Sequence, residues 1–564
     1  MAQTKLRSQE WWSRSNTDYY SFARRAWLRS EGFNGDIFDG RPVIGICNSW
    51  SELNNCNMHL RTVAEAVKRG VWAAGGLPLE FPTISLGEMF MRPTTMLYRN
   101  LMAMDVEESI RANPIDGVVL LCGCDKTTPA QLMGCASADI PAIMVPGGPM
   151  LAGQWRTQRL GSGTDGRKLF DLFRTGKVSE EEWQEIEGGL ARSAGHCTVM
   201  GTASTMTSLA EAMGMTLTGC ANIPAPDSRR LAIAETSGRR IVDMVREDLR
   251  PSRIMTRKAL ENAITVDMAI GGSTNAVVHL LAIAGRLGID LKLDDFDAIS
   301  RRTPYIVNVK PSGQYVMEDL FAAGGLPAVM REILPCLNGD ALTVTGKTIL
   351  ENVEKSECFN RDVIRTMADP LHPEGGTVIL RGNLAPDGAV LKQTAASPRL
   401  LKHRGVAYVF ESYEDMRTQI DREDLPVTGD SVLVMKGGGP KGAPGFPEWG
   451  HIPLPRVLLN QGVNDMVRIS DARMSGTSFG TVVLHVAPEA AIGGPLALTQ
   501  TGDEIELDAE ARKLTLCVKE EELARRRAAF VPPAPKYDRG YGRMFLEHVT
   551  QANIGCDFDF LHAK

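Results

Sequence analysis

The stretch Gly117-Val118-Val119-Leu120-Leu121-Cys122-Gly123-Cys124-Asp125-Lys126-Thr127-Thr128-Pro129 decides the fold. Its first half is a short apolar run, which is typical of a buried strand. Its second half places two thiols, a carboxylate and an amine before Thr128-Pro129, where a helix can begin. In open α/β sheets, ligands bind at the carboxyl ends of the strands. The cysteines and the aspartate indicate a metal, whereas the lysine has no role at this stage.

The neighbouring segments repeat this alternation of strand and helix. Apolar runs bounded by turn residues predict strands, and longer stretches ended by glycines predict helices. Such an order implies βαβ units and a parallel sheet covered by helices on both faces. The expected elements are a strand over Pro42–Cys47, a helix over 60–74, an extended segment over 79–84, a helix over 94–112 and a strand over 142–145.

The texture changes near residue 370, where Pro370–Gly376 has the composition of a linker. Short strands dominate beyond it, which predicts a β-rich second domain, either a barrel or a sandwich. We therefore expect an N-terminal α/β domain over residues 1–372 and a C-terminal β-barrel-like domain over 373–564. The expected strands are 377–381, 388–392, 405–411, 431–436, 466–470, 480–486, 504–507 and 513–518.

Length and charge exclude several classes of protein. The chain has 564 residues, too many for one core, and 43% of them are hydrophobic, as in ordinary globular proteins. A net charge of -6 gives no basic excess for nucleic acid or a membrane surface. No apolar run approaches a membrane span, and the start over residues 1–10 lacks a signal core. We expect a cytoplasmic protein that acts on a small molecule.

The eleven cysteines contain no CxxC pair, so buried packing is the default interpretation for each one. Cys56, Cys124 and Cys197 differ because each ends a strand-like or loop segment at an apparent helix entry, so they could converge at one sheet edge. Glu88, Asp125 and Glu448 offer hard oxygen ligands for a divalent cation. A soft sulfur site beside a hard oxygen site suits an iron–sulfur Lewis acid next to Mg²⁺.

Each of two further motifs has both a structural and a functional interpretation. Gly437–Gly442 matches the dinucleotide pattern G-x-G-x-x-G, but the following Ala443-Pro444 cannot start the helix that such a site requires. Asp471–Thr477 follows a predicted strand and is either a polar turn capped by Ser475 or a turn that positions a reactive serine. No G-x-S-x-G elbow supports a hydrolase.

Together these blocks resemble the dehydratase family that contains dihydroxy-acid dehydratase, 6-phosphogluconate dehydratase and the sugar-acid dehydratases. The resemblance covers nearly the whole chain, and within the family it is strongest to the L-arabinonate dehydratase group. The chain departs from the family pattern beside the site, at Gly87, Met89, His196 and Val199. The matching blocks are Cys56-Asn57 with His59, 123–129, 197–206, 271–275, Gly439-Pro440 and 470–476.

The resemblance implies a hydro-lyase that converts an aldonate such as L-arabinonate to a 2-keto-3-deoxy acid. Cys56, Cys124 and Cys197 would hold a [2Fe–2S] cluster. Mg²⁺ would be held by Glu88, Asp125, carbamylated Lys126 and Glu448. Ser475 would be the base and Thr477 would line the substrate pocket. The resemblance also implies an α/β domain with a β-barrel-like domain, in homodimers or homotetramers.

Three alternatives remain open at this stage. One is dihydroxy-acid dehydratase of branched-chain amino-acid synthesis, which lies in the same family. Another is an NAD(P)-dependent oxidoreductase that uses the glycine loop. The third is an iron–sulfur sensor without turnover. Aldonate dehydration, nucleotide binding and cluster content distinguish them.

Overall fold

A parallel sheet organises the first half of the chain. The computed structural model describes residues 6–12 and 18–563. The expectation that residues 1–10 lack a signal core falls partly outside it, since residues 1–5 are not described. Within the described part, four parallel strands have the spatial order β2-β1-β3-β4. Every residue of β1, β3 and β4 is buried, which confirms the predicted sheet. The strands are β1 (Val43–Asn48), β2 (Leu77–Pro82), β3 (Gly117–Cys122) and β4 (Ala142–Pro146).

The strand order creates a natural ligand site. β1 pairs with β3 although the chain passes through β2 between them. From β1 the chain moves to one side of the sheet, and from β3 it moves to the other. The carboxyl ends of β1 and β3 therefore form the point at which the winding reverses, where open α/β sheets bind ligands.

Helices cover both faces of this sheet, as predicted. α3 (Leu60–Ala73) packs against α9 (Ser228–Glu247) on one face, and α4 (Met96–Ala112) packs against α5 (Thr127–Ala138) on the other. α3 and α9 approach so closely that a Cβ on Gly238 would lie 2.2 Å from the carbonyl oxygen of Val67, and the glycine at residue 238 allows this approach. The predicted helix start near 94 shifts to Met96.

The remaining helices of the first half extend this layer. α5, α8, α11 and α12 pack against one another beside the sheet. Their bounds, with those of the smaller elements, are α1 (Gln9–Trp12), α2 (Tyr19–Ser30), β5 (Gly153–Trp155), β6 (Gln158–Leu160), α6 (Thr164–Arg174), α7 (Glu180–Leu190), α8 (Thr202–Ala212), α10 (Pro251–Ile254), α11 (Arg257–Ile270), α12 (Asn275–Arg286), α13 (Leu293–Arg302), α14 (Met317–Ala322), α15 (Gly325–Glu332) and α16 (Ile349–Val353).

The second half forms a closed barrel, which decides between the predicted barrel and sandwich. In the described residues eight strands close in the order β10-β11-β12-β8-β7-β14-β13-β9. β9, β10, β11 and β12 are parallel, so the loops after β10 and β11 leave the same rim. The strands are β7 (Val378–Gly382), β8 (Ala385–Leu391), β9 (Lys402–Phe410), β10 (Val432–Met435), β11 (Arg468–Ser470), β12 (Val482–Ala487), β13 (Glu504–Asp508) and β14 (Lys513–Leu516).

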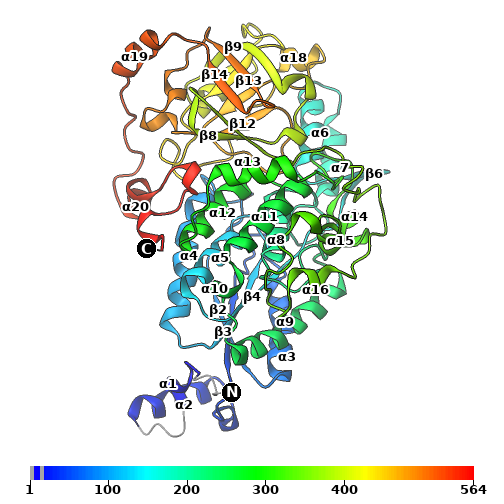
Figure 1. Ribbon diagram of the computed structural model, residues 1–564, viewed down its shortest axis with the longest axis vertical. Coiled ribbons are helices and arrows are strands. Elements are labelled where there is room, and N and C mark those ends of the chain that lie inside the picture. The colour runs from blue at the N-terminus through cyan, green and yellow to red at the C-terminus, as the bar shows by residue number, and fades with distance from the viewer. Residues whose placement is uncertain (1–5, 13–17, 564) are drawn as a thin grey trace.

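The two halves are interleaved. The chain enters the barrel between Val353 and Val378, and the predicted division after residue 372 falls in this passage and stays a prediction. The last segment returns to the first half, where Phe545 and Phe558 pack with Met96 and Leu97 of α4. Figure 1 shows this red segment beside α4 and α12. The helices of the barrel half are α17 (Tyr413–Gln419), α18 (Arg456–Asn460), α19 (Glu520–Ala528) and α20 (Gly540–His548).

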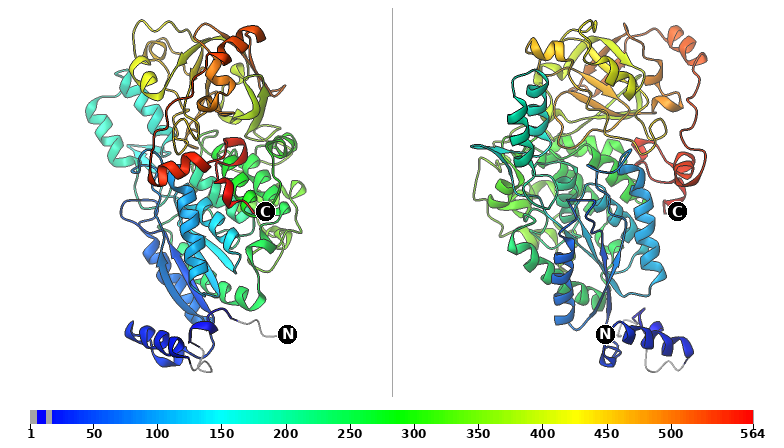
Figure 2. Two further views of the ribbon diagram at one scale, coloured as in Figure 1. Left: turned by 90° about the vertical axis from the view of Figure 1, so that its left-hand side faces the viewer. Right: turned by 180° about the vertical axis from the view of Figure 1, so that it is seen from behind.

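Two helices of the first half also approach the barrel. α6 and α7 project upward beside it, as both views in Figure 2 show. Ser179 caps the N-terminus of α7 through a capping box with Glu182. Among the described residues, no helix is long and apolar enough to cross a bilayer.

Candidate active site

Two of the three predicted cluster cysteines lie at the reversal point of the sheet. Cys56 lies in the loop after β1, and Cys124 lies in the turn after β3. The backbone N–H of Cys124 donates to Asn57 Oδ1 at 3.1 Å, which ties the two loops together. A Cβ on Gly123 would lie 2.6 Å from the carbonyl oxygen of Cys56, so the loops come this close only because residue 123 is glycine.

The third cysteine faces these two. Cys197 lies in the bend before α8, where its thiol acts electrostatically on Cys56 and the Cys124 thiol acts on Cys197. Burial, followed by the Cys124 thiol, raises the pKa of Cys197 to about 12. The hydrogen bond with Cys124 and then burial raise the pKa of Cys56 well above its ordinary value. Several thiolates together need a positive partner, and iron is one that thiolates favour.

Lys126 lies at the centre of a carboxylate cluster. Its side chain is fully buried, and its Nζ is 2.7 Å from Asp125 Oδ2. Glu448 Oε1 lies 3.6 Å and Glu88 Oε2 lies 3.8 Å from the same nitrogen. These three acids come from the β3–α5 turn, from the segment before α4 and from the loop after β10. The structure thus brings together the four residues that the resemblance assigns to Mg²⁺.

Glu88 is held from the start of α4. Thr94 Oγ1 donates to Glu88 Oε1 at 2.9 Å, and the Thr95 hydroxyl and backbone N–H donate to Oε2. Burial raises the pKa of Glu88, Lys126 opposes this, and the nearby Glu448 raises the pKa further. Its carboxylate oxygens therefore favour a neighbouring cation.

Glu448 is held by residues from both halves of the chain. Arg473 Nη1 donates to Glu448 Oε1 at 3.0 Å, and Arg473 Nη2 reaches Thr94 Oγ1 at 3.2 Å. Asn275 Nδ2 donates to Glu448 Oε1 at 3.3 Å and to the carbonyl oxygen of Met474 at 3.1 Å. These bonds attach the barrel rim to the sheet and fix the turn that carries Ser475 beside the carboxylates.

Ser475 lies in the turn after β11. Its Oγ is 3.0 Å from Thr477 Oγ1, so the predicted base and the predicted pocket residue are hydrogen-bonded to each other. A Cβ on Gly476 would lie 2.5 Å from the backbone nitrogen of Thr202, which shows how closely this turn packs on the segment after Cys197. The turn therefore lies between the cysteine side and the carboxylate side of the site.

The donor set fits both implied groups by its chemistry. Three thiols gather on one side, and three carboxylates gather around one amine on the other. In residues 6–12 and 18–563 no three His, Cys, Asp or Glu side chains are spaced as a ready metal shell. The acids on the carboxylate side do not form such a shell because they converge on the Lys126 ammonium. Asn275 Oδ1 is buried there without a hydrogen-bond partner.

The sequence alone did not assign roles to Arg473 and Asn275. Both lie in blocks that stood out, 470–476 and 271–275, but no local pattern tells which distant oxygen a side chain reaches. No role was predicted for Arg167, because α6 has the sequence pattern of an ordinary charged helix. Its guanidinium donates to Thr477 Oγ1 at 2.7 Å.

The glycine loop does not have the features of a nucleotide site. No helix begins after Gly437–Gly442 before α18 in this described segment. The backbone N–H groups of Lys441 and Gly442 donate to the Glu489 carboxylate, so they are already used. The alternative of a dinucleotide site in this loop loses its structural basis.

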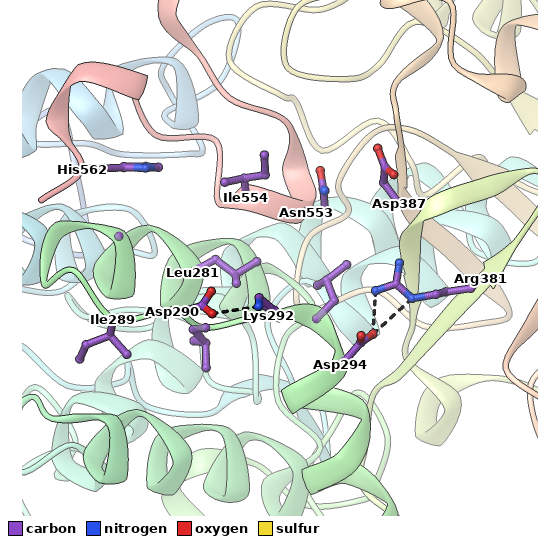
Figure 3. Close-up of a pocket in the computed structure, with 13 residues that line it drawn as sticks. Leu281, Ile289, Asp290, Lys292, Asp294, Arg381, Asp387, Asn553, Ile554 and His562 are labelled. Atoms are coloured by element: carbon purple, nitrogen blue, oxygen red, sulfur yellow. Dashed lines mark hydrogen bonds and ion pairs between the residues drawn. The ribbon is translucent and has the colours of Figure 1, made fainter. Parts of the chain in front are cut away.

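A cleft of about 1190 Å³ leads to the site between α6 and the barrel. Arg167, Glu448, Trp449 and His451 are among the residues that line it. Another cavity, of about 430 Å³, lies between α12, the start of α13 and the C-terminal segment (Figure 3). Asp294 pairs with Arg381 and Asp290 with Lys292 in its lining, and none of the predicted site residues lines it.

The chain combines a parallel-sheet α/β half with a closed β-barrel half, and the comparisons with known proteins identify it as a dehydratase, a hydro-lyase. The chain belongs to the dihydroxy-acid/6-phosphogluconate dehydratase family. The N-terminal domain of that family matches residues 41–352, and its C-terminal domain matches residues 362–556.

Named relatives share nearly the whole chain. L-arabinonate dehydratase of Rhizobium leguminosarum bv. trifolii (strain WSM2304) is 54% identical over 99% of this chain and 96% of its own length. L-arabonate dehydratase of Azospirillum brasilense is also 54% identical, over 99% and 97%. 6-Deoxy-6-sulfo-D-gluconate dehydratase of Pseudomonas putida is 51% identical, over 99% and 97%.

Proposed function

We propose that the protein dehydrates a sugar acid, an aldonate such as L-arabinonate, to the 2-keto-3-deoxy acid. The observation that carries this proposal is the convergence of three thiols, the Lys126 carboxylate cluster and Ser475 at one sheet edge. The relatives named for sugar acids, at 51–54% identity over nearly the full length, support the substrate class.

The thiols of Cys56, Cys124 and Cys197 would hold a [2Fe–2S] cluster. Glu88, Asp125, Glu448 and a carbamylated Lys126 would hold Mg²⁺. When bound, these groups supply Lewis acidity to the substrate's carboxylate and hydroxyl oxygens. Replacing the Lys126 ammonium by a carbamate together with Mg²⁺ leaves the net charge of the cluster unchanged, which supports the exchange.

Ser475 is the proposed base. Its Oγ, as the alkoxide, takes the proton from C2 and becomes a hydroxyl. The C3–O bond breaks, and the leaving hydroxide takes this proton from Ser475 and departs as water. The resulting enol becomes the 2-keto acid by tautomerisation. Arg473 and Asn275 keep the serine turn against the carboxylates during these steps, since both bond Glu448 and lie within or against the turn.

A substrate comparison tests this proposal. Protein purified without oxygen is incubated with L-arabinonate, other five- and six-carbon aldonates and 2,3-dihydroxyisovalerate, and the 2-keto acid formed is measured. We expect the highest kcat/KM with an aldonate. A preference for 2,3-dihydroxyisovalerate would make the protein a dihydroxy-acid dehydratase of branched-chain synthesis. A coloured protein that forms no 2-keto acid from any of these would support the sensor alternative.

A further inference from the structure

The side chain of Thr477 has a fixed orientation. A Cβ on Gly201 would lie 2.9 Å from Thr477 Cγ2, so the methyl group lies against residue 201. A Cβ on Gly163 would lie 2.4 Å from Thr477 Oγ1, so the hydroxyl faces the start of α6. Thr164 Oγ1 also donates to the Thr477 carbonyl oxygen at 2.7 Å. These contacts with the segments around Gly163 and Gly201 hold the Thr477 hydroxyl toward the start of α6.

That hydroxyl lies between a guanidinium and the proposed base. Arg167 Nη1 donates to Thr477 Oγ1 at 2.7 Å and to the Gly163 carbonyl oxygen at 3.3 Å. Ser475 Oγ lies 3.0 Å from Thr477 Oγ1. The acidic groups that act on the guanidinium are Glu448 and the Cys197 thiol, both of which belong to the site.

The chemistry of the guanidinium fixes the direction of the hydrogen bond between Arg167 and Thr477. A guanidinium only donates, so Thr477 Oγ1 must accept from Arg167. The single hydrogen of the threonine hydroxyl is then free for Ser475 Oγ. Thr477 Oγ1 keeps a second lone pair, so either hydroxyl can donate at this 3.0 Å contact while Ser475 is protonated. The deprotonated Ser475 Oγ that the proposed base requires has no hydrogen, so in that state Ser475 accepts from Thr477, and the cationic donor at the far end polarises the chain. Hydrogen bonds to an oxygen favour its anionic form.

We propose that Arg167 is a positioning residue for the dehydration, which acts through Thr477 to keep Ser475 Oγ an acceptor that faces the proton to be removed. The inference rests on the proposed function, because it concerns the same base. It adds a residue on α6 to a site built otherwise from the sheet edge and the barrel rim. It also gives Thr477 a role in proton transfer in addition to lining the pocket.

A double-mutant cycle tests the proposal in the cluster-loaded full-length protein. The four proteins are the wild type, Arg167→Met, Thr477→Val and the double variant. We expect each single substitution to lower kcat by about tenfold to a hundredfold with KM little changed, since general-base catalysis contributes factors of this order and more. The double variant should be no slower than the slower single variant, because both remove the same chain of hydrogen bonds.

Three further measurements separate positioning from a merely structural role. Iron and sulfide content and the visible absorption spectrum should match the wild type in all variants. The kinetic isotope effect with substrate deuterated at C2 should rise in Arg167→Met, because proton removal becomes more rate-limiting. Arg167→Lys, which keeps a cationic donor, should recover part of kcat. Arg246→Met on α9 is the control, since this arginine is 55% exposed and pairs with the exposed Asp243 and the Ala74 carbonyl oxygen, and its kcat should not change.

The outcomes distinguish this inference from the function on which it rests. Losses that multiply in the double variant, or a loss confined to KM, would show that Arg167 acts independently of Thr477 and would overturn the inference alone. Unchanged kcat in Arg167→Met would do the same. A wild-type protein that forms no product from any aldonate would overturn the proposed function and this inference with it.

Discussion

Lys126 shows how one residue can define a site. A fully buried lysine is costly unless opposite charges surround it, and here the Asp125, Glu448 and Glu88 carboxylates all lie within 4 Å of its Nζ. The same three carboxylates would repel one another without the ammonium. The lysine and the acids therefore stabilise each other in the absence of metal, and any metal must compete with or replace this charge.

Removing that charge should destabilise the metal-free protein. We expect Lys126→Met to lower the free energy of unfolding by about 3 kcal/mol, because it leaves mostly buried carboxylates without their partner. Urea denaturation in the presence of a chelator measures the change. Lys258→Met is the control, since Lys258 and its partner Asp340 are 55% and 67% exposed and such surface pairs contribute little to the free energy of unfolding. Equal losses in the two variants would argue against the central position of Lys126.

At the scale of elements, two parallel strand ends bring the cysteine loops together, and a glycine lets them touch. The buried runs of β1 and β3 position Cys56 and Cys124, and Gly123 allows the turn after β3 to approach the Cys56 backbone. The geometry of the proposed cluster site thus depends on a residue that carries no ligand.

Substituting this glycine should affect the cluster before it affects the fold. A Cβ at residue 123 would lie 2.6 Å from both the Cys56 carbonyl oxygen and Asn57 Oδ1, so Gly123→Ala must push the loops apart. We expect less iron and sulfide per chain than in the wild type. Gly188→Ala in α7 is the control, because nothing lies within 4 Å of the added methyl group. Full iron and sulfide content in Gly123→Ala would contradict this account of the turn.

The sequence predicted the helices and strands better than the contacts between them. Continuous apolar runs identified β1, β3 and β4, since strands buried on both faces lack polar alternation. The eight short strands of the second half were also expected, but their closure into a barrel was not separable from a sandwich, because a strand's pattern does not name its neighbour. For the same reason the site blocks were found, whereas the contacts of Arg167 and Arg473 were not.

At the scale of the whole molecule, folding buries several uncharged histidines. Burial lowers the pKa of His485 to about 3 and those of His279 and His451 well below the ordinary value. The ring nitrogens His485 Nε2, His279 Nε2 and His451 Nδ1 are buried without a hydrogen-bond partner. These side chains stay neutral in the folded protein at pH values where the unfolded chain protonates them.

Acid should therefore destabilise the fold. Because the folded pKa of His485 lies below its unfolded value of 6.5, its stabilising contribution is complete above that pH and is lost as the pH falls toward 3. We expect this histidine alone to cost about 2 kcal/mol between pH 8 and pH 5. Urea unfolding at the two pH values measures the change, and His485→Asn, which tolerates the positive φ of this position, should lose less. A free energy of unfolding that does not fall between pH 6.5 and 5 would contradict this expectation.

The most direct test of the central claim compares wild-type protein and Ser475→Ala, both purified without oxygen. For each, iron, sulfide and the 2-keto acid released from L-arabinonate are measured in one sample. We predict equal iron and sulfide contents in the two proteins, product formation by the wild type, and a rate lower by about a hundredfold or more in the variant. Full activity in Ser475→Ala, or an active wild type without iron, would contradict the assignment of this site.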